Sequence, residues 1–190
     1  MKELSLIKDR MKMFAPQIDD SRIEDIVAHL KLETFKRNEY LQKAGQIPNK
    51  AYLITEGIAR NFFKEKDKER TLWFFYEGDP IRGQSYMMQH PATNDIICVT
   101  DVKAWTLTWD ASRELVKQSD FWEKVAGLSR ERFYADAFNV WKEMKYKPAT
   151  QRYKWYISRY PQAAQYIPIG QLASFLGIAI ETLSRIRSKK

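Results

Sequence analysis

A series of short apolar segments between Leu32 and Thr108 constrains the fold of this chain more than any other feature. The segments are rich in β-branched and aromatic residues, and they read LETFKRNEYLQKAGQ, AYLITEG, IARNFFK, RTLWFFYEG, IICVT and VKAWTLT. Turn-forming residues such as Glu56-Gly57 and Gly78-Asp79-Pro80 separate them. Many short strands at this spacing are typical of an all-β barrel or jelly roll. We therefore expect a β-roll body in this part of the chain.

Two helical segments precede the β-roll. Residues 3–14 and 20–30 have apolar positions at helical spacing, and Asp19, Asp20 or Ser21 can cap the second helix. Helices and an antiparallel β body in one chain predict the α+β fold class.

A long helix is predicted after the β-roll. Asp110 is the expected N-cap of a short helix over 111–118, and an uninterrupted helical pattern then runs from Asp120 to Tyr146. Such a helix is about 40 Å long, more than a small β body can cover. Its apolar positions are Phe121, Val125, Leu128, Tyr134, Ala137 and Trp141. We expect part of this series to meet a second copy of the chain in a homodimer. The alternative is a helix that packs only on its own barrel.

The excess positive charge of the chain lies in its last fifty residues, from the end of the long helix onward. The net charge is +8. Ten of the 32 basic residues but only two of the 24 acidic residues lie at positions 141–190, so this segment carries the whole excess. A basic segment of this kind favours binding to a polyanion such as DNA. A solvated basic tail is the alternative.

The segment from Ile169 to Arg187 has the pattern of a helix-turn-helix. Ala173 is small enough for two helices to cross, and Gly177, four residues later, tolerates the positive φ of a tight turn. The residues expected to pin the helices are Leu172, Leu176, Ile178, Leu183 and Ile186. The residues left on the outer face, and expected to contact DNA, are Ile180, Glu181, Ser184, Arg185 and Arg187. A helical hairpin that only packs is the alternative.

These features together resemble the Crp/Fnr family of bacterial transcription regulators. The most specific pieces are E-T-L-S-R-I at 181–186 and G-D-x-I at 78–81. The resemblance implies a cyclic-nucleotide-binding-like β-roll, a homodimer joined along the long helix, and a recognition helix in the major groove of double-stranded DNA. It further implies RNA polymerase as a partner, and Glu181 and Arg185 as readers of cytosine and guanine. Only three residues follow Arg187, so we expect the helix-turn-helix to lack the wing of the family.

The expected layout has three parts. Residues 1–118 form the β-roll sensor domain, 119–146 the dimerisation helix, and 147–190 the wingless helix-turn-helix domain. Lys147-Pro148 marks the hinge, because proline disfavours helical geometry in the residue before it.

The sensor departs from a cyclic-nucleotide pocket. Arg82-Gly83 occupy the positions of the family's Gly-Glu pair, and Asn94-Asp95 those of its Arg-Ser/Thr pair, which hold ribose and phosphate. Asp95 would repel a phosphate, and a buried phosphate without a partner is costly. The candidate effector-pocket residues are Arg82, Gly83, Gln84, Ser85, Asn94 and Asp95. We expect that cAMP is not the natural ligand; a small-molecule effector of another kind is possible. Arg82 is either an anion contact from a new direction or an ordinary surface arginine.

Catalytic and metal chemistry have little support. His29 and His90 are isolated, and Cys98 is the only cysteine and lies in an apolar run, so neither a metal site nor a redox sensor is expected. The motifs G-x-S-x-G, P-loop and G-x-G-x-x-G are absent from the sequence. We expect no cofactor and no catalytic residue.

The function predicted from the sequence is that of a non-enzymatic, DNA-binding transcription regulator. No stretch of 18 uncharged apolar residues and no signal peptide is present, so we expect a cytoplasmic protein that does not bind membranes. Two alternatives remain open: a constitutive DNA binder with a vestigial sensor, and a cupin-like β-barrel enzyme.

Overall fold

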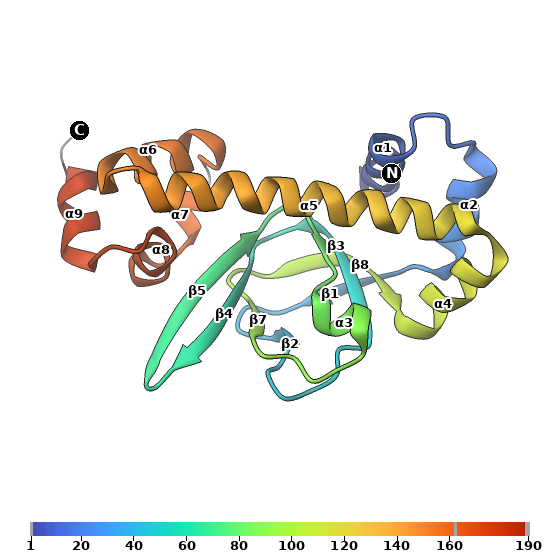
Figure 1. The fold of residues 1–190 in the computed structure, drawn as a ribbon, viewed down its shortest axis with the longest axis horizontal. Helices are drawn as coiled ribbons and strands as arrows, with labels where there is room; N and C mark the ends of the chain where they lie inside the picture. The colour runs from blue at the N-terminus through green and yellow to red at the C-terminus, as the bar shows by residue number, and fades with distance from the viewer. Residues whose placement is uncertain (1, 162, 189–190) are drawn as a thin grey trace.

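The computed structural model describes residues 2–161 and 163–188, and it places a β-roll against one long helix (Figure 1). The roll consists of two four-stranded antiparallel sheets, with strand orders β1-β8-β3-β6 and β2-β7-β4-β5. The strands are β1 (Lys31–Phe35), β2 (Tyr40–Gln42), β3 (Lys50–Glu56), β4 (Ala59–Glu65), β5 (Lys68–Phe75), β6 (Pro80–Ile81), β7 (Asp95–Cys98) and β8 (Val102–Thr108). The predicted β-roll is confirmed, and β6 is the one strand that was not expected.

The core of the roll lies between the two sheets. Side chains alternate between the two faces of each strand, so one face of each sheet supplies the core. The buried residues are Phe35, Leu41, Ile54, Ala59, Phe75, Ile81, Ile96, Cys98, Val102 and Ala104. Burial of this apolar surface is what holds the two sheets together.

Helices form before, within and after the roll. They are α1 (Lys2–Phe14), α2 (Asp20–His29), α3 (Gln84–Met88), α4 (Trp109–Gln118), α5 (Asp120–Tyr146), α6 (Ala149–Arg159), α7 (Ala163–Tyr166), α8 (Ile169–Leu176) and α9 (Ile180–Ser188). Asp19 caps α2, because its carboxylate accepts the Arg22 N–H at 2.9 Å. The short helix α3 was not expected from the sequence.

The predicted cap of α4 was wrong. Thr108, not Asp110, is the N-cap: its hydroxyl accepts the N–H of Ala111 at 3.3 Å, and the helix begins at Trp109. Thr108 ends β8 in an extended conformation, so the strand passes directly into the cap. Asp110 lies in the first turn, where its negative charge favours the helix dipole.

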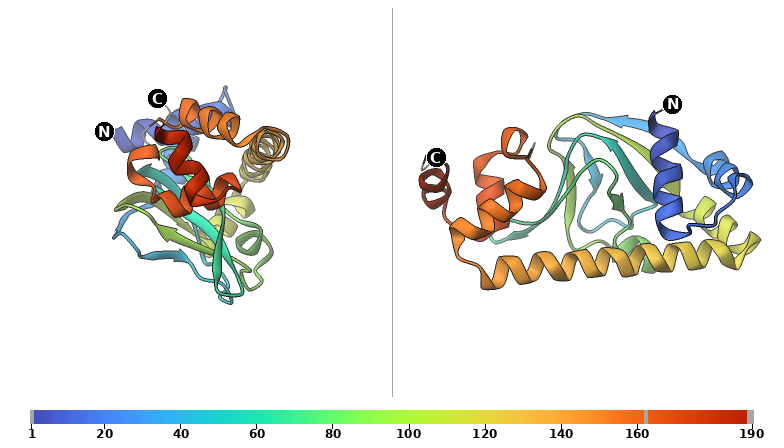
Figure 2. Two further views of the ribbon diagram at one scale, coloured as in Figure 1. Left: turned by 90° about the vertical axis from the view of Figure 1, so that its left-hand side faces the viewer. Right: turned by 90° about the horizontal axis from the view of Figure 1, so that it is seen from above.

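Helix α5 has the predicted bounds and runs along the whole roll (Figures 1 and 2). The apolar series of α5 is divided between the roll and the outward side of the helix. Val125 is buried within its own chain, and Phe121 packs on Trp122 with the Arg22 guanidinium over its ring. Leu128, Tyr134 and Trp141 are exposed, and Ala137 is partly exposed.

The C-terminal helices pack on the roll at the far end of α5 from α1 and α2 (Figures 1 and 2). One core joins them to the roll: Ile58, Phe74 and Val99 of the roll lie in the same buried cluster as Tyr156, Ile167, Leu172, Ala173, Leu176 and Leu183. Among the described residues, no strand follows β8.

Candidate DNA-binding surface and sensor cavities

The turn between α8 and α9 has the geometry that its sequence predicts. Gly177 adopts φ +64°, and its N–H donates to the Ser174 carbonyl at 3.2 Å, while the N–H of Ile178 donates to Ala173 at 3.1 Å. Ala173 is fully buried where the helices meet. An L side chain at position 177 would be strained at this φ, so glycine is required by the backbone.

The outer face of α9 carries four of the five predicted DNA-binding residues. Ile180, Glu181, Ser184 and Arg185 are all exposed, and their spacing places them on one helix face, which we call the recognition face. Arg187 is partly buried and donates to the Ala164 carbonyl at 3.2 Å, so it contributes to packing within the chain.

Arg152 of α6 contacts its own chain. Its Nη1 donates to the Met144 carbonyl at 3.2 Å, near the end of α5. The same nitrogen lies 3.3 Å from the position that a Cβ on Gly177 would occupy. Arg152 therefore ties the long helix to the turn of the helix-turn-helix. Lys154 is exposed, and Lys189 and Lys190 lie outside the described residues.

The G-D-x-I motif forms a tight turn at the end of β5. Gly78 has φ +86°, and a Cβ there would lie 2.2 Å from the Arg10 guanidinium. Asp79 accepts the N–H of Tyr76 at 2.9 Å. Burial raises the pKa of the Asp79 carboxyl, and this hydrogen bond together with the positive charges of Arg10 and Arg159 offsets part of the rise.

Asn94 and Asp95 are engaged by their own chain. The Asn94 amide donates to Asn61 Oδ1 at 2.5 Å, and its carbonyl accepts from Gln42 at 3.0 Å. Asp95 Oδ1 accepts the N–H of Ala44 at 3.0 Å. These contacts hold the Asn94 side chain just before β7 and the Asp95 side chain at the first residue of β7, and none of them presents a positive charge to a phosphate.

The remaining predicted sensor residues face different surroundings. Gly83 lies next to Gln42, Gln84 is exposed, and Ser85 is buried. Arg82 instead points toward α5, where Nη2 lies 3.5 Å from the Ala126 carbonyl. Of the six predicted residues, only Arg82 lines either of the two cavities described below.

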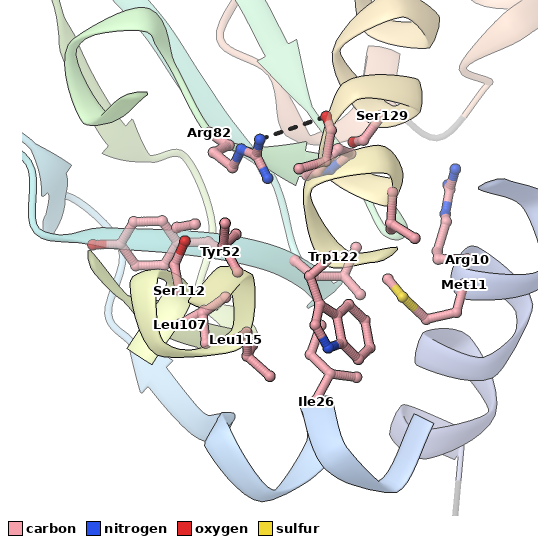
Figure 3. A pocket seen from close by; sticks show the side chains of 16 residues that line it. Arg10, Met11, Ile26, Tyr52, Arg82, Leu107, Ser112, Leu115, Trp122 and Ser129 are labelled. Carbon is pink, nitrogen blue, oxygen red and sulfur yellow. Dashed lines mark hydrogen bonds between the residues drawn. The ribbon is translucent and has the colours of Figure 1, made fainter. Parts of the chain in front are cut away.

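The cavity that Arg82 does line was not expected from the sequence (Figure 3). It has a volume of about 150 Å³ and lies between α1, α2, the outer part of the roll, α4 and α5. Met11, Ile26, Leu107, Leu115, Trp122 and Val125 contribute apolar side chains, and Arg10, Arg82, Ser112 and Ser129 contribute polar ones. Its residues come from α1, α2, β3, β6, β8, α4 and α5, so no local motif could have indicated it. We call it the helix–roll cavity.

A second, smaller cavity lies between β5, α5 and α6. Its volume is about 80 Å³, and its charged residues are Arg10, Asp79, Arg132, Asp136 and Arg159. Arg159 lies 3.8 Å from Asp136, so α6 is linked to α5 by an exposed ion pair next to the G-D-x-I turn.

Groups of reactive or metal-binding side chains are sparse. Among the described residues, no three His, Cys, Asp or Glu side chains are placed to hold a metal. Burial raises the pKa of the Cys98 thiol to about 12, so it stays protonated at neutral pH. His29 and His90 contact the backbone carbonyls of Asp25 and Pro91.

None of the helices in 2–161 and 163–188 is long and apolar enough to cross a bilayer.

Comparison with known proteins identifies a domain family that matches the β-roll and solved structures with a similar fold. Residues 32–119 match the family model of the cyclic nucleotide-binding domain. No curated protein matches the sequence. FixK2 from Bradyrhizobium japonicum is similar in structure, with a TM-score of 0.71 and 14% identity over 84% of this chain and 83% of that chain.

Two further solved structures show the same arrangement. The regulator CLP of Xanthomonas campestris, described as responsive to c-di-GMP, has a TM-score of 0.66 and 16% identity over 90% of this chain and 91% of its own. A transcriptional regulator of the Crp/Fnr family from Eubacterium rectale has a TM-score of 0.69 and 14% identity over 90% of this chain and 82% of its own. The resemblance noted in the sequence is thus confirmed at the level of the fold: the chain carries a domain that matches the cyclic nucleotide-binding family, within the fold of the Crp/Fnr transcription regulators.

Proposed function

We propose that this protein is a non-enzymatic transcription regulator that binds double-stranded DNA through α9 as a homodimer. The observation that carries the proposal is the recognition face. Its residues Ile180, Glu181, Ser184 and Arg185 are all exposed on one side of α9, which follows the turn at Gly177. The net charge of +8 lies in the segment that contains this helix. A basic helix-turn-helix is suited to phosphate contacts and to reading the major groove.

The chemistry of the recognition face suggests which bases it reads. Arg185 can donate two hydrogen bonds to guanine, and Glu181 can accept from the amino group of cytosine. Ile180 is 49% exposed and has no polar group, so it suits contact with the methyl group of thymine. A site that contains G, C and T within each half is therefore expected.

The homodimer follows from the outward side of α5. Leu128, Tyr134, Phe138 and Trp141 form an exposed series, which we call the apolar stripe. The last three follow the i, i+4, i+7 spacing of one helix face, opposite the side that packs on the roll. If α5 of a second chain covers the apolar stripe, the dimer presents two recognition faces. Their spacing would then match DNA half-sites about 34 Å apart.

The layout that supports this function has the sensor at 1–118, the dimerisation helix at 119–146 and the DNA-binding domain at 147–190. Helix α5 contacts the sensor along its inner side and leads directly into α6. A ligand that favours one position of α5 would shift the spacing of the recognition helices. The contacts of Asn94 and Asp95 argue against cAMP as that ligand.

The test is selection of genomic DNA fragments by the full chain, followed by a gel shift on the enriched site. Arg185→Ala is the variant, and Lys124→Ala, at an exposed position of α5 remote from α9, is the control. We expect a paired site whose binding weakens with Arg185→Ala only. Failure to enrich any sequence would contradict the proposal, and binding that no small molecule changes would favour a constitutive DNA binder.

A further inference from the structure

The helix–roll cavity has a size that limits its ligand. Its volume is about 150 Å³, and apolar side chains from α1, α2, β8, α4 and α5 form most of its wall. An engineered apolar cavity of about this volume in another protein stays dry and binds benzene. Pockets for larger molecules are commonly at least twice this size. The cavity therefore suits a single ring or a short alkyl chain, and it is too small for a nucleotide.

A guanidinium without a carboxylate partner borders this apolar space. Arg82 is partly buried, and within the described residues its side chain makes one hydrogen bond, the long contact of 3.5 Å to the Ala126 carbonyl (Figure 3). In the part of the chain that the structure describes, no carboxylate lies within ion-pair distance of it. Arg130 adds further positive charge nearby, and burial together with Arg130 lowers the pKa of Arg82. A buried cation without an anion is costly, so the site is incomplete on its own.

Hydroxyl groups stand next to the same space. Ser112 of α4 and Ser129 of α5 line the cavity. Tyr86 is fully buried beside Ser112, and its hydroxyl has no hydrogen-bond partner of good geometry among the described residues. A carboxylate that bound Arg82 would bring an acceptor close to these donors. Arg82, Ser112 and Ser129 thus add a few polar groups to a mostly apolar wall, with Arg10 at a separate place on it (Figure 3), and a wall of this composition suits an amphipathic anion.

We propose that the helix–roll cavity binds a small monocarboxylic acid, with its carboxylate on Arg82 and its apolar or aromatic body between α4 and α5. Such a ligand would contact Trp122 and Val125 on the inner side of α5, while the apolar stripe occupies the outer side of the same helix. Its effect on DNA binding rests on the proposed function, because α5 then links the ligand to the recognition helix. Binding of the acid itself does not depend on that function.

The test uses fluorine NMR with 4-fluorophenylacetate and its neutral isostere 4-fluorophenylacetamide as probes of the full chain. A charge-assisted hydrogen bond to Arg82 is expected to make the acid bind about tenfold more tightly than the amide. The Arg82→Met variant keeps the length and apolar contacts of the side chain, so it should abolish the difference between the two probes. Lys124→Met removes one exposed charge of α5 outside the cavity and should change neither affinity.

A second variant tests the location. Ala126 lines the cavity, and Ala126→Leu would fill part of it, so both probes should bind at least several-fold more weakly. Equal binding of acid and amide to the wild type would overturn the proposal without any variant. Unchanged binding to a folded Ala126→Leu would overturn it as well. A gel shift without ligand separates this outcome from failure of the proposed function, since DNA binding can persist when the acid does not bind.

Discussion

Ser174 of α8 accepts a hydrogen bond from the backbone N–H of Thr71 in β5, at 3.0 Å, and its hydroxyl lies 3.3 Å from the Glu69 carbonyl that it donates to. The first helix of the helix-turn-helix is therefore bound to an edge strand of the sensor. Thr71 also accepts a hydrogen bond from the buried Arg60, whose guanidinium pairs with Glu69. The contact thus connects α8 to a polar network of Arg60, Glu69 and Thr71 on the β4–β5 part of the roll.

Ser174→Ala tests this contact. The substitution removes both hydrogen bonds, and we expect a loss of about 1–2 kcal/mol in the free energy of unfolding. For a chain of this size, each kcal/mol lowers Tm by roughly 2–4 °C. Thermal unfolding followed by circular dichroism measures the change. Ser184→Ala, on the exposed face of α9, is the control and should leave Tm unchanged; equal Tm values for the two variants would show that the contact does not stabilise the fold.

The sequence predicted the local structure of this chain better than its long-range contacts. The apolar rhythm of the strands, the proline after Lys147 and the glycine at position 177 act within a few residues. The elements that they predicted appear with nearly the predicted bounds, whereas β6 and α3 were not predicted. The predicted N-cap of α4 was wrong by two residues, because serine, threonine and aspartate are nearly equivalent at this position. Periodicity likewise places Val125 in the apolar series of the helix. It cannot show whether Val125 packs on the roll of its own chain or on a second chain.

The site shows the same limit. The outer face of α9 could be predicted because a helix-turn-helix fixes which positions face outward. The helix–roll cavity could not, because Met11, Leu107 and Trp122 meet only after the chain has folded. The sequence indicated Arg82 as an anion contact but assigned it to the pocket of Asn94 and Asp95, from which its side chain points away.

The apolar stripe predicts a dimer. Phe138→Glu places a carboxylate in the centre of the exposed series, and burying it without a partner costs several kcal/mol, so the variant should be monomeric. Sedimentation velocity at micromolar concentration compares it with the wild type. Lys64→Glu, at an exposed position of β4 and outside α5, should remain dimeric. A monomeric wild type would contradict both the dimer and paired half-sites.

Cyclic nucleotides are expected to bind weakly or not at all. Gly83 offers no side chain to the ribose, and Asp95 adds a negative charge where a phosphate would lie. Isothermal titration with cAMP and cGMP should therefore give no measurable heat of binding at micromolar concentrations. The same preparation should bind its DNA site, which shows that the protein is folded. Low-micromolar affinity for either nucleotide would contradict this interpretation of the pocket.

Asp79 should make stability depend on pH. Burial raises the pKa of its carboxyl in the folded chain above the unfolded value, so unfolding releases a proton and the folded state loses stability as pH rises through that interval. Asn at this position can still accept the Tyr76 N–H but does not ionise. The Tm of Asp79→Asn minus that of the wild type should therefore increase as the pH is raised from 4 to 7. A constant difference would mean that Asp79 titrates alike in both states.

Arg185 and Lys154 should differ in how they affect DNA binding. Arg185 lies on the recognition face, so Arg185→Ala should cost about 1–3 kcal/mol per half-site and relax the preference at one base pair. Lys154, exposed on α6, is expected to reach only phosphate. Lys154→Ala should therefore weaken binding to all sequences alike and reduce the slope of log K against log salt concentration by about one unit.

The measurement is a binding series on the paired site, a single half-site and an unrelated sequence at several salt concentrations. Without a wing among the described residues, few phosphate contacts are available beyond the helices, so we expect affinity to fall steeply when one half-site is removed. Both variants should fold with unchanged Tm, because neither side chain makes a hydrogen bond or ion pair within the described chain. Equal, sequence-independent losses for Arg185→Ala and Lys154→Ala would mean that α9 contributes charge but does not read bases.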